Sequence, residues 1–294
     1  MRVISAYCSV VELRHAGGLQ LWLRRARVAS LAAKRFGRWA IEEGFTAPER
    51  VTPGGPIAAS LRVPIARTGA DPRLEAGKRH NVRLAATAFH GVVIAPDRPL
   101  SFWRTLGPAT AARGFSWGME LRSGCAVPAI GGGLCLVSNA LFALAVELGW
   151  HILERHGHSM ALGDAEALDA TVAYPYVDLR IAPREGRAIL EVAVRGDVLV
   201  LAIHHAAIAG KLRVELERHQ TDDGRVRDTR IRRRVWREPA NGAAASSRMT
   251  SRAALVEDSV IVDDHQRIPH ELRTCLDCNQ TACRARVELP EAAR

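Results

Sequence analysis

The chain has 294 residues, of which 48% are hydrophobic and 24% charged, the balance of a globular protein with a sizeable core. No apolar run reaches the roughly 18–20 residues of a membrane span, and Met1–Tyr7 lacks the apolar core of a secretory signal, so we expect a cytoplasmic protein, at most peripheral to a membrane. The net charge of +10 comes with only three lysines in an arginine- and alanine-rich chain, and no nucleic-acid-binding motif accompanies it, so nucleic acid is not an expected partner.

Residues 1–56 are predicted to be a basic helical region followed by a linker. In residues 18–43, Trp22, Leu23 and other apolar residues occupy a broad helical face among arginines. Such a helix can lie on an anionic membrane surface or pack against the main domain, and the pattern favours packing. Residues 44–56 contain three prolines and the pair Gly54–Gly55, which indicates a linker.

Residues 57–260 are predicted to form the main domain, of the α+β class, with a central cysteine-bearing helix packed on an antiparallel β-sheet. Asp71 and Pro72 are typical of a helix start, and we expect that helix to run to Phe89. A short strand at 92–94, loops over 100–130 and a buried helix at 134–148 follow. Further strands are expected at 150–155, 170–174, 177–181, 188–194, 198–204 and 212–217.

Two later segments are expected to lie outside the core. The arginines of residues 225–237 are interleaved with aspartates, which favours a solvated face over a site for nucleic acid or anionic lipid. Residues 239–252 are rich in Ala, Ser and Asn, which indicates a flexible loop.

The segment Ala129–Asn139 carries the strongest chemical signal. Gly131, Gly132 and Gly133 lead through Leu134 into Cys135, which lies at the start of the predicted buried helix. A thiol at a helix N-terminus meets the positive end of the helix dipole and unpaired N–H groups, which favour the reactive thiolate. The glycines leave room for a substrate to approach, so Gly131, Gly132 and Gly133, with Ser138, are predicted to bind substrate or an oxyanion.

Histidines and carboxylates follow in the order that a thiol nucleophile requires. Cys135 would be the nucleophile, His156 or His158 its base, and Asp169 or Asp178 the group that orients the imidazole. The same pattern also fits a tightly turned helix start with an inert buried cysteine and structural histidines. Spacing alone leaves both interpretations open.

Several blocks of the chain resemble the VanW-like family, accessory proteins named after a component of some vancomycin-resistance gene clusters. The matching blocks are Asn81–Ala86, Leu100–Trp103, Gly107–Thr110, Arg113–Phe115, Ile130–Cys135, Glu154–Ser159 and Ala173–Arg180. The resemblance implies a link to peptidoglycan metabolism in the cell envelope or to antibiotic resistance, without defining a reaction. In this chain Leu136 follows the cysteine, where the family usually has Gln.

Two functions from different classes follow from these residues. The first is a thiol enzyme that carries out acyl transfer or amide hydrolysis on a peptide-containing cell-wall precursor, with no cofactor in the main domain. The second is a non-catalytic accessory or binding protein, whose glycine-rich loop and His156-x-His158 pair form a ligand pocket. Leu136 in place of Gln favours the second.

Residues 261–294 are predicted to be a separate cysteine-rich tail. Cys275, Cys278 and Cys283 give the spacing Cys-x2-Cys-x4-Cys, and its first pair suits a zinc knuckle. A zinc site takes four ligands, for which His270 or His265 is the fourth candidate. Free thiols or a redox pair are the alternatives to zinc.

Overall fold

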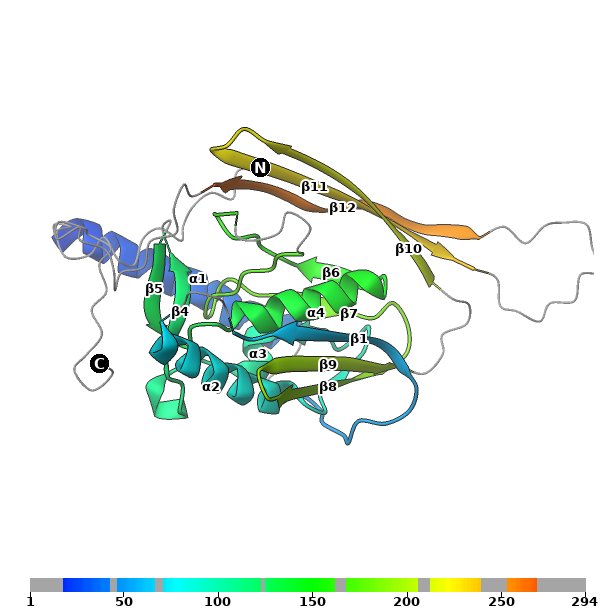
Figure 1. The fold of residues 1–294 in the computed structure, drawn as a ribbon, viewed down its shortest axis with the longest axis horizontal. Coiled ribbons are helices and arrows are strands. Elements are labelled where there is room, and N and C mark those ends of the chain that lie inside the picture. The colour runs from blue at the N-terminus through cyan, green and yellow to red at the C-terminus, as the bar shows by residue number, and fades with distance from the viewer. Residues whose placement is uncertain are drawn as a thin grey trace, which may run out of the picture.

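The computed structural model describes residues 18–42, 47–66, 71–122, 125–161, 168–205, 212–238 and 253–268. Within these ranges a few helices are combined with antiparallel sheets, which confirms the expected α+β class (Figure 1). Among the helices so described, none combines the length and apolar character needed to cross a bilayer.

Helices and strands are interspersed along the chain up to a central helix, and the described elements after that helix are all strands. The helices are α1 (Gly18–Glu42), α2 (Pro72–Phe89), α3 (Phe102–Leu106), the short 3-10 helix η3 (Ala111–Arg113) and α4 (Cys135–Glu147). The strands are β1 (Ile57–Pro64), β2 (Val93–Ile94), β3 (Leu100–Ser101), β4 (Trp117–Arg122), β5 (Cys125–Ile130), β6 (His151–Glu154), β7 (Arg180–Ala182), β8 (Ala188–Arg195), β9 (Val198–His205), β10 (Leu212–Asp222), β11 (Val226–Arg237) and β12 (Ala254–Arg267).

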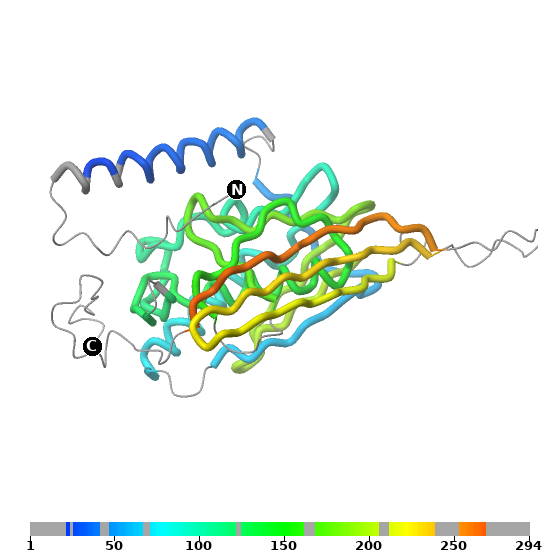
Figure 2. Tube along the Cα trace, turned by 90° about the horizontal axis from the view of Figure 1, so that it is seen from above, coloured from blue at the N-terminus to red at the C-terminus, as the bar shows by residue number. Residues whose placement is uncertain are grey.

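The strands form four antiparallel sheets, ordered β1-β9-β8-β2, β3-β7-β6, β4-β5 and β10-β11-β12. Helix α4 contacts β1 and β9 on one side and β6 and β7 on the other. The long strands β10, β11 and β12 run across the domain on a further side, and α1 lies along one edge (Figures 1 and 2).

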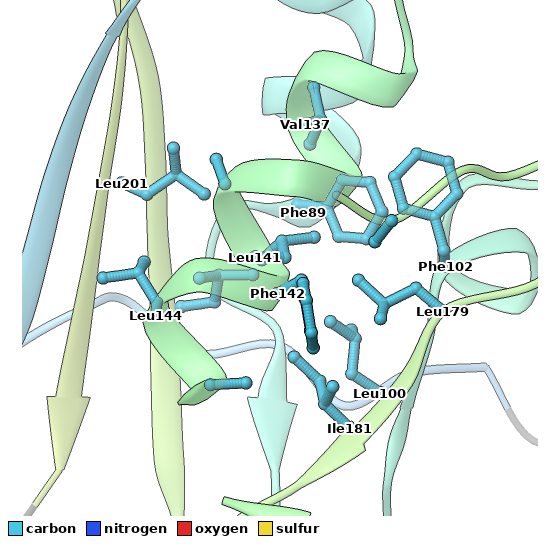
Figure 3. Packing of buried hydrophobic residues seen from close by; sticks show 14 of the residues in the cluster. Phe89, Leu100, Phe102, Val137, Leu141, Phe142, Leu144, Leu179, Ile181 and Leu201 are labelled. Atoms are coloured by element: carbon cyan, nitrogen blue, oxygen red, sulfur yellow. The ribbon is translucent and has the colours of Figure 1, made fainter. Parts of the chain in front are cut away.

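Helix α4 is the centre of the core because it is apolar on nearly every face. Val137, Leu141, Phe142 and Leu144 are fully buried in it. They pack among side chains from α2, α3 and the surrounding strands, as Figure 3 shows. This packing fixes the N-terminal end of α4, and with it the position of Cys135.

Helix α2 begins as the sequence predicts. The Asp71 side chain accepts hydrogen bonds from the N–H groups of Arg73 and Leu74, at 2.9 and 3.4 Å, and Pro72 opens the first turn. Gly77 lets this helix approach β4 closely, because a Cβ atom there would fall 1.7 Å from the Trp117 carbonyl oxygen. The helix therefore supports the β4–β5 hairpin that precedes Cys135.

Side chains in the second half of α1 pack on the domain, while apolar side chains described in its first half are exposed. Arg35 is buried against Glu154, and Trp39 packs against the core. Trp22, Leu23 and Val28 remain exposed. Contact of this basic helix with an anionic membrane surface stays a prediction.

The prediction that residues 100–130 are loops is wrong, since they include β3, α3, β4 and β5. The small residues that suggested loops instead allow the backbones of neighbouring segments to pack closely against each other. A Cβ at Gly118 on β4 would lie 2.4 Å from the Gly132 carbonyl oxygen, so glycine is needed where the hairpin meets the glycine-rich turn.

The strand predicted at 170–174 is also wrong. The backbone of this segment bonds to loops, with the Thr171 N–H donating to the His156 carbonyl at 2.8 Å and Ala173 paired with Val177. The strand predicted at 177–181 shortens to β7, and the one at 212–217 extends into the longer β10.

The arginine-rich segment 225–237 forms β11, the middle strand of the β10-β11-β12 sheet. Its exposed face carries ion pairs to β12, including Arg230–Asp263 and Arg232–Asp258. Its other face places Ile231 and Arg233 in the interior, and Arg233 bonds to Glu257 at 2.8 Å. The domain boundary predicted at residue 260 falls inside β12.

Candidate active site

The glycine-rich turn before Cys135 needs glycine at each position. Gly131 and Gly133 adopt left-handed backbone conformations, with φ of 80° and 95°. Gly132 packs directly on the β4 backbone, where a Cβ would lie 2.3 Å from the Gly118 carbonyl carbon. The three glycines therefore shape the turn that aims α4, so they are required by the fold whatever they bind.

Asn81 of α2 holds this turn in place. Its buried amide donates to the carbonyls of Ser116 and Gly132, at 2.9 and 3.0 Å, and accepts from the Ser116 N–H at 2.8 Å. All three bonds join segments far apart in the sequence. Asn81 belongs to a block that resembles the family, but local spacing gave no sign of this role.

Cys135 is the first residue of α4 and is partly buried in a cavity of about 700 Å³. Its Sγ lies 3.7 Å from Thr171 Oγ1 and 4.0 Å from the Val172 carbonyl oxygen. The cavity is lined by the glycine turn, by aromatic side chains and by charged groups, among them Gly131, Gly132, Gly133, Trp103, Tyr174, Tyr176, Lys78, Glu120, His158 and Asp169.

His158 and Asp169 form a hydrogen-bonded pair beside the thiol. His158 Nδ1 lies 2.6 Å from Asp169 Oδ1, and the His158 backbone N–H donates to Asp169 Oδ2 at 2.7 Å. His158 also lines the cavity beside Cys135, and its charge acts on the thiol. Because Asp169 occupies Nδ1, the ring nitrogen left for the thiol is Nε2.

The charges of these three residues stabilise one another. Burial on its own would raise the pKa of the Cys135 thiol, but the hydrogen bond and positive charge of His158 bring it below its ordinary value. Burial would lower the pKa of His158, but Asp169 and Cys135 raise it to about 10. The pKa of Asp169 is lowered, because His158 outweighs the effect of burial. The arrangement therefore favours the ionised forms of Cys135 and His158 more than isolated side chains would.

Polar side chains of α4 hold the segment that carries Asp169. Ser138 is fully buried, and its hydroxyl donates to the Ala170 carbonyl at 2.6 Å, while Asn139 accepts from the Ala170 N–H at 2.8 Å. Ser138 thus binds the residue that follows Asp169 and is not among the residues that line the cavity. Its role in binding substrate or an oxyanion stays a prediction. Asn139 and Thr171 were not singled out from the sequence.

His156 lies apart from the thiol. Its Nε2 is 3.1 Å from Glu154 Oε1, and Arg35 bonds to the same carboxylate. Burial would raise the pKa of Glu154, but the hydrogen bonds from His156 and Arg35 lower it to about 2. Of the two histidines predicted as the base, the structure brings His158 to Cys135 and leaves His156 in this ion-pair cluster.

Asp178 is fully buried and lies at the start of α3. It accepts hydrogen bonds from the Ser101 hydroxyl at 2.5 Å and from the Trp103 N–H at 3.0 Å. Burial raises the pKa of Asp178 to about 6, against these hydrogen bonds. Of the two carboxylates predicted to orient the imidazole, Asp169 occupies that position and Asp178 caps a helix.

Across the described residues, no group of His, Cys, Asp and Glu side chains has the arrangement of a metal site. Cys275, Cys278, Cys283 and His270 lie outside the described residues, so the zinc site stays a prediction. His265, the alternative fourth ligand, is exposed on β12, with its Nδ1 2.5 Å from Asp228 Oδ1.

Comparison with known proteins identifies the domain that carries this site. Residues 77–204, which are less than half of the chain, match the family model described as VanW like protein, so this region is VanW-like. It is 29% identical over 120 residues to the vancomycin B-type resistance protein VanW of Enterococcus faecalis, covering 39% of this chain and 44% of that protein. It is 28% identical over 139 residues to the uncharacterized protein YoaR of Bacillus subtilis, covering 46% of each.

The matched stretch therefore spans less than half the length of these curated relatives. No solved structure matches the chain significantly. The matched region contains Cys135, His158 and Asp169, whereas α1 and the β10-β11-β12 sheet lie outside it.

Proposed function

We propose that the chain is a thiol enzyme that performs acyl transfer or amide hydrolysis on peptide-containing cell-wall precursors. The observation that carries the proposal is one cavity that contains Cys135, at the N-terminus of a buried helix, together with His158, whose ring Asp169 orients. Nucleophile, base and orienting carboxylate are the parts of this kind of catalysis.

The proposed reaction has two steps, and both Cys135 and His158 return to their starting states at the end of the second. The Cys135 thiolate attacks a peptide carbonyl carbon, and the C–N bond breaks as the His158 imidazolium gives its proton to the leaving amine. The resulting thioester is attacked by water or by an acceptor amine, which returns a proton to His158 as the thiolate leaves. Asp169 keeps the imidazole in one tautomer and orientation throughout.

The start of α4 is suited to binding the developing negative charge. The N–H groups of Leu136 and Val137 are occupied by the carbonyls of Gly133 and Leu134. The N–H groups of Gly131 and Gly132 are likewise occupied, by the carbonyls of Ser116 and Ala129. The backbone N–H groups of Gly133, Leu134 and Cys135 are therefore the candidate oxyanion donors, next to the attacking sulfur.

The cavity and the relatives support the choice of substrate. A volume of about 700 Å³ accommodates a short peptide, and the wall offers both aromatic and charged side chains, including Trp103, Tyr174 and Lys78. The E. faecalis relative is named for vancomycin resistance. A peptide-containing cell-wall precursor is therefore the substrate class we propose.

The test is to trap the thioester. The protein is incubated with synthetic peptidoglycan stem peptides, quenched in acid and measured by intact mass spectrometry. We expect an acyl adduct that maps to Cys135, is absent in Cys135→Ser, and persists in the matched control Cys125→Ser. Absence of any adduct with either free or lipid-linked stem peptides would overturn the enzyme proposal.

A binding protein is the second candidate, because the apolar side chain of Leu136 lines the cavity directly beside the thiol. In that case calorimetry would detect stem-peptide binding to wild type and to Cys135→Ser with equal affinity, without an adduct. Equal binding without chemistry separates this candidate from the enzyme.

A further inference from the structure

Strand β12 lies outside the matched VanW-like region, yet it reaches the candidate active site. Its residues alternate between the two faces of the sheet: Val262, Asp264 and Gln266 face inward, whereas Asp263 and His265 face solvent. The inward three also line the cavity that contains Cys135. One wall of the cavity therefore comes from a part of the chain that the family model does not cover.

Gln266 contacts both members of the His158–Asp169 pair. Its buried Nε2 donates to the His158 carbonyl at 3.1 Å and to Asp169 Oδ2 at 3.3 Å. Both partners are acceptors, so the amide nitrogen must face them, and its two N–H groups are both used. One side chain thus ties the histidine backbone to the carboxylate that orients its ring.

Asp264 reaches the same pair through Arg155. Its carboxylate binds the Arg155 guanidinium in a bidentate pair, at 2.6 and 2.5 Å, and Arg155 Nε donates to the Asp169 carbonyl at 2.5 Å. Both side chains of the pair are largely buried. Bidentate pairs fix orientation as well as distance, so the backbone at Asp169 is held from a second direction.

The backbone of β12 also anchors the chain just after His158. The Arg267 N–H donates to the Ser159 carbonyl at 3.0 Å, and the Ala161 N–H donates to the Arg267 carbonyl at 2.9 Å. These bonds hold the loop that carries His158 against the end of β12.

We infer that β12 is part of the candidate active site and that Gln266 is a positioning residue for the His158–Asp169 pair. The inference rests on the proposed function for its role in catalysis, but the positioning itself can be measured without any substrate. Asp264 acts in the same direction at longer range, through Arg155.

The experiment follows the titration of the His158 ring by NMR in a Cys135→Ala background, so that the thiol makes no contribution. Gln266→Met keeps the size of the side chain and removes its donors. We expect the His158 pKa to fall by about one unit towards its ordinary value, because Asp169 is no longer held against the ring. His265→Ala, on the opposite face of the same strand, is the matched control and should leave the titration unchanged.

A second measurement links positioning to the thiol. With Cys135 restored, Gln266→Met should slow alkylation of Cys135 by iodoacetamide several-fold at pH 7, because a His158 ring that is held less firmly lowers the pKa of the thiol less. If Gln266→Met does not fold, Asp264→Asn should shift both readouts in the same direction by a smaller amount.

The outcomes separate the two proposals. An unchanged His158 titration in both Gln266→Met and Asp264→Asn overturns the positioning role, while the adduct at Cys135 would still support the enzyme. A shifted titration without any adduct would support the positioning role and overturn the proposed function.

Discussion

His156 and His158 lie two residues apart on the same segment, and each is paired with a carboxylate, but the two pairs have different surroundings. His158 bonds to Asp169 and lines the same cavity as the Cys135 thiol. His156 contacts Glu154, whose carboxylate is shared with Arg35 of α1. A carboxylate beside a histidine is therefore not sufficient to mark a catalytic base. The third residue beside each pair distinguishes their roles. The Cys135 thiol makes the His158–Asp169 pair a candidate for proton transfer, whereas Arg35 makes the His156–Glu154 pair a contact that attaches α1 to the domain.

Substituting each histidine in turn should give the largest contrast. His158→Gln removes the positive charge and hydrogen bond that lower the pKa of Cys135, so alkylation of Cys135 by iodoacetamide at pH 7 should slow roughly tenfold or more. His156→Gln should leave that rate within about twofold. The rate is measured by mass spectrometry of the Cys135 peptide, with Cys125 of β5 as the internal reference thiol.

Equal slowing by both histidine substitutions would show that the histidines act through the shared segment and not through contact with the thiol. The comparison between the two pairs would then carry no information about catalysis.

Substituting the carboxylate of each pair should give a smaller contrast: Glu154 should affect stability, and Asp169 should affect the reactivity of the thiol. Glu154→Gln weakens the contact that docks α1, so it should lower the free energy of unfolding by about 1–3 kcal/mol while leaving the alkylation rate of Cys135 unchanged. Asp169→Asn should slow the alkylation several-fold, because the imidazolium loses the negative partner that raises its pKa. Urea unfolding and the alkylation assay measure the two effects on the same samples.

A loss of thiol reactivity in Glu154→Gln equal to that in Asp169→Asn would contradict this division of roles.

The free energy of unfolding should depend on pH differently for the two pairs, with the Glu154 contribution lost in acid and the His158 contribution lost in alkali. The pKa of Glu154 is lowered to about 2, so its contribution is present above its ordinary value near 4.5 and is lost as the pH falls towards 2. The pKa of His158 is raised to about 10, so its contribution is lost as the pH rises through that value. The decline of the urea midpoint in acid should therefore be smaller in Glu154→Gln, and its decline at alkaline pH should be smaller in His158→Gln.

If Glu154→Gln instead reduced the decline of stability at alkaline pH, the ionisation of Glu154 and His158 would differ from the one inferred from the structure.

The parts of the site that the sequence predicts are those that lie close together along the chain. The glycine turn, the buried helix that begins at Cys135 and the cap at Asp71 all depend on neighbouring residues, and the structure contains them. The choice between Asp169 and Asp178 could not be made from spacing, because long-range packing brings one to His158 and the other to α3.

The supporting contacts were missed for the same reason. Asn81 and Gln266 act across 51 and 108 residues of sequence, respectively. Strand β12 was missed because its interior and exposed faces both carry acidic residues, such as Asp264 and Asp263, which hides the alternation of apolar and polar positions. Its acidic side chains are satisfied by arginines of other elements, a pairing that only the fold reveals.

The most direct test of the account is the ionisation of Cys135 itself. The ultraviolet absorbance of the thiolate is followed against pH as the difference between wild type and Cys135→Ser, and again with His158→Gln in both proteins. We predict that the wild-type thiolate appears at a lower pH than the ordinary range near 8.5, and that His158→Gln returns its appearance to that range. A wild-type thiolate that appears only near pH 8.5 or above, with or without His158, would contradict the claim that these two residues form a reactive pair.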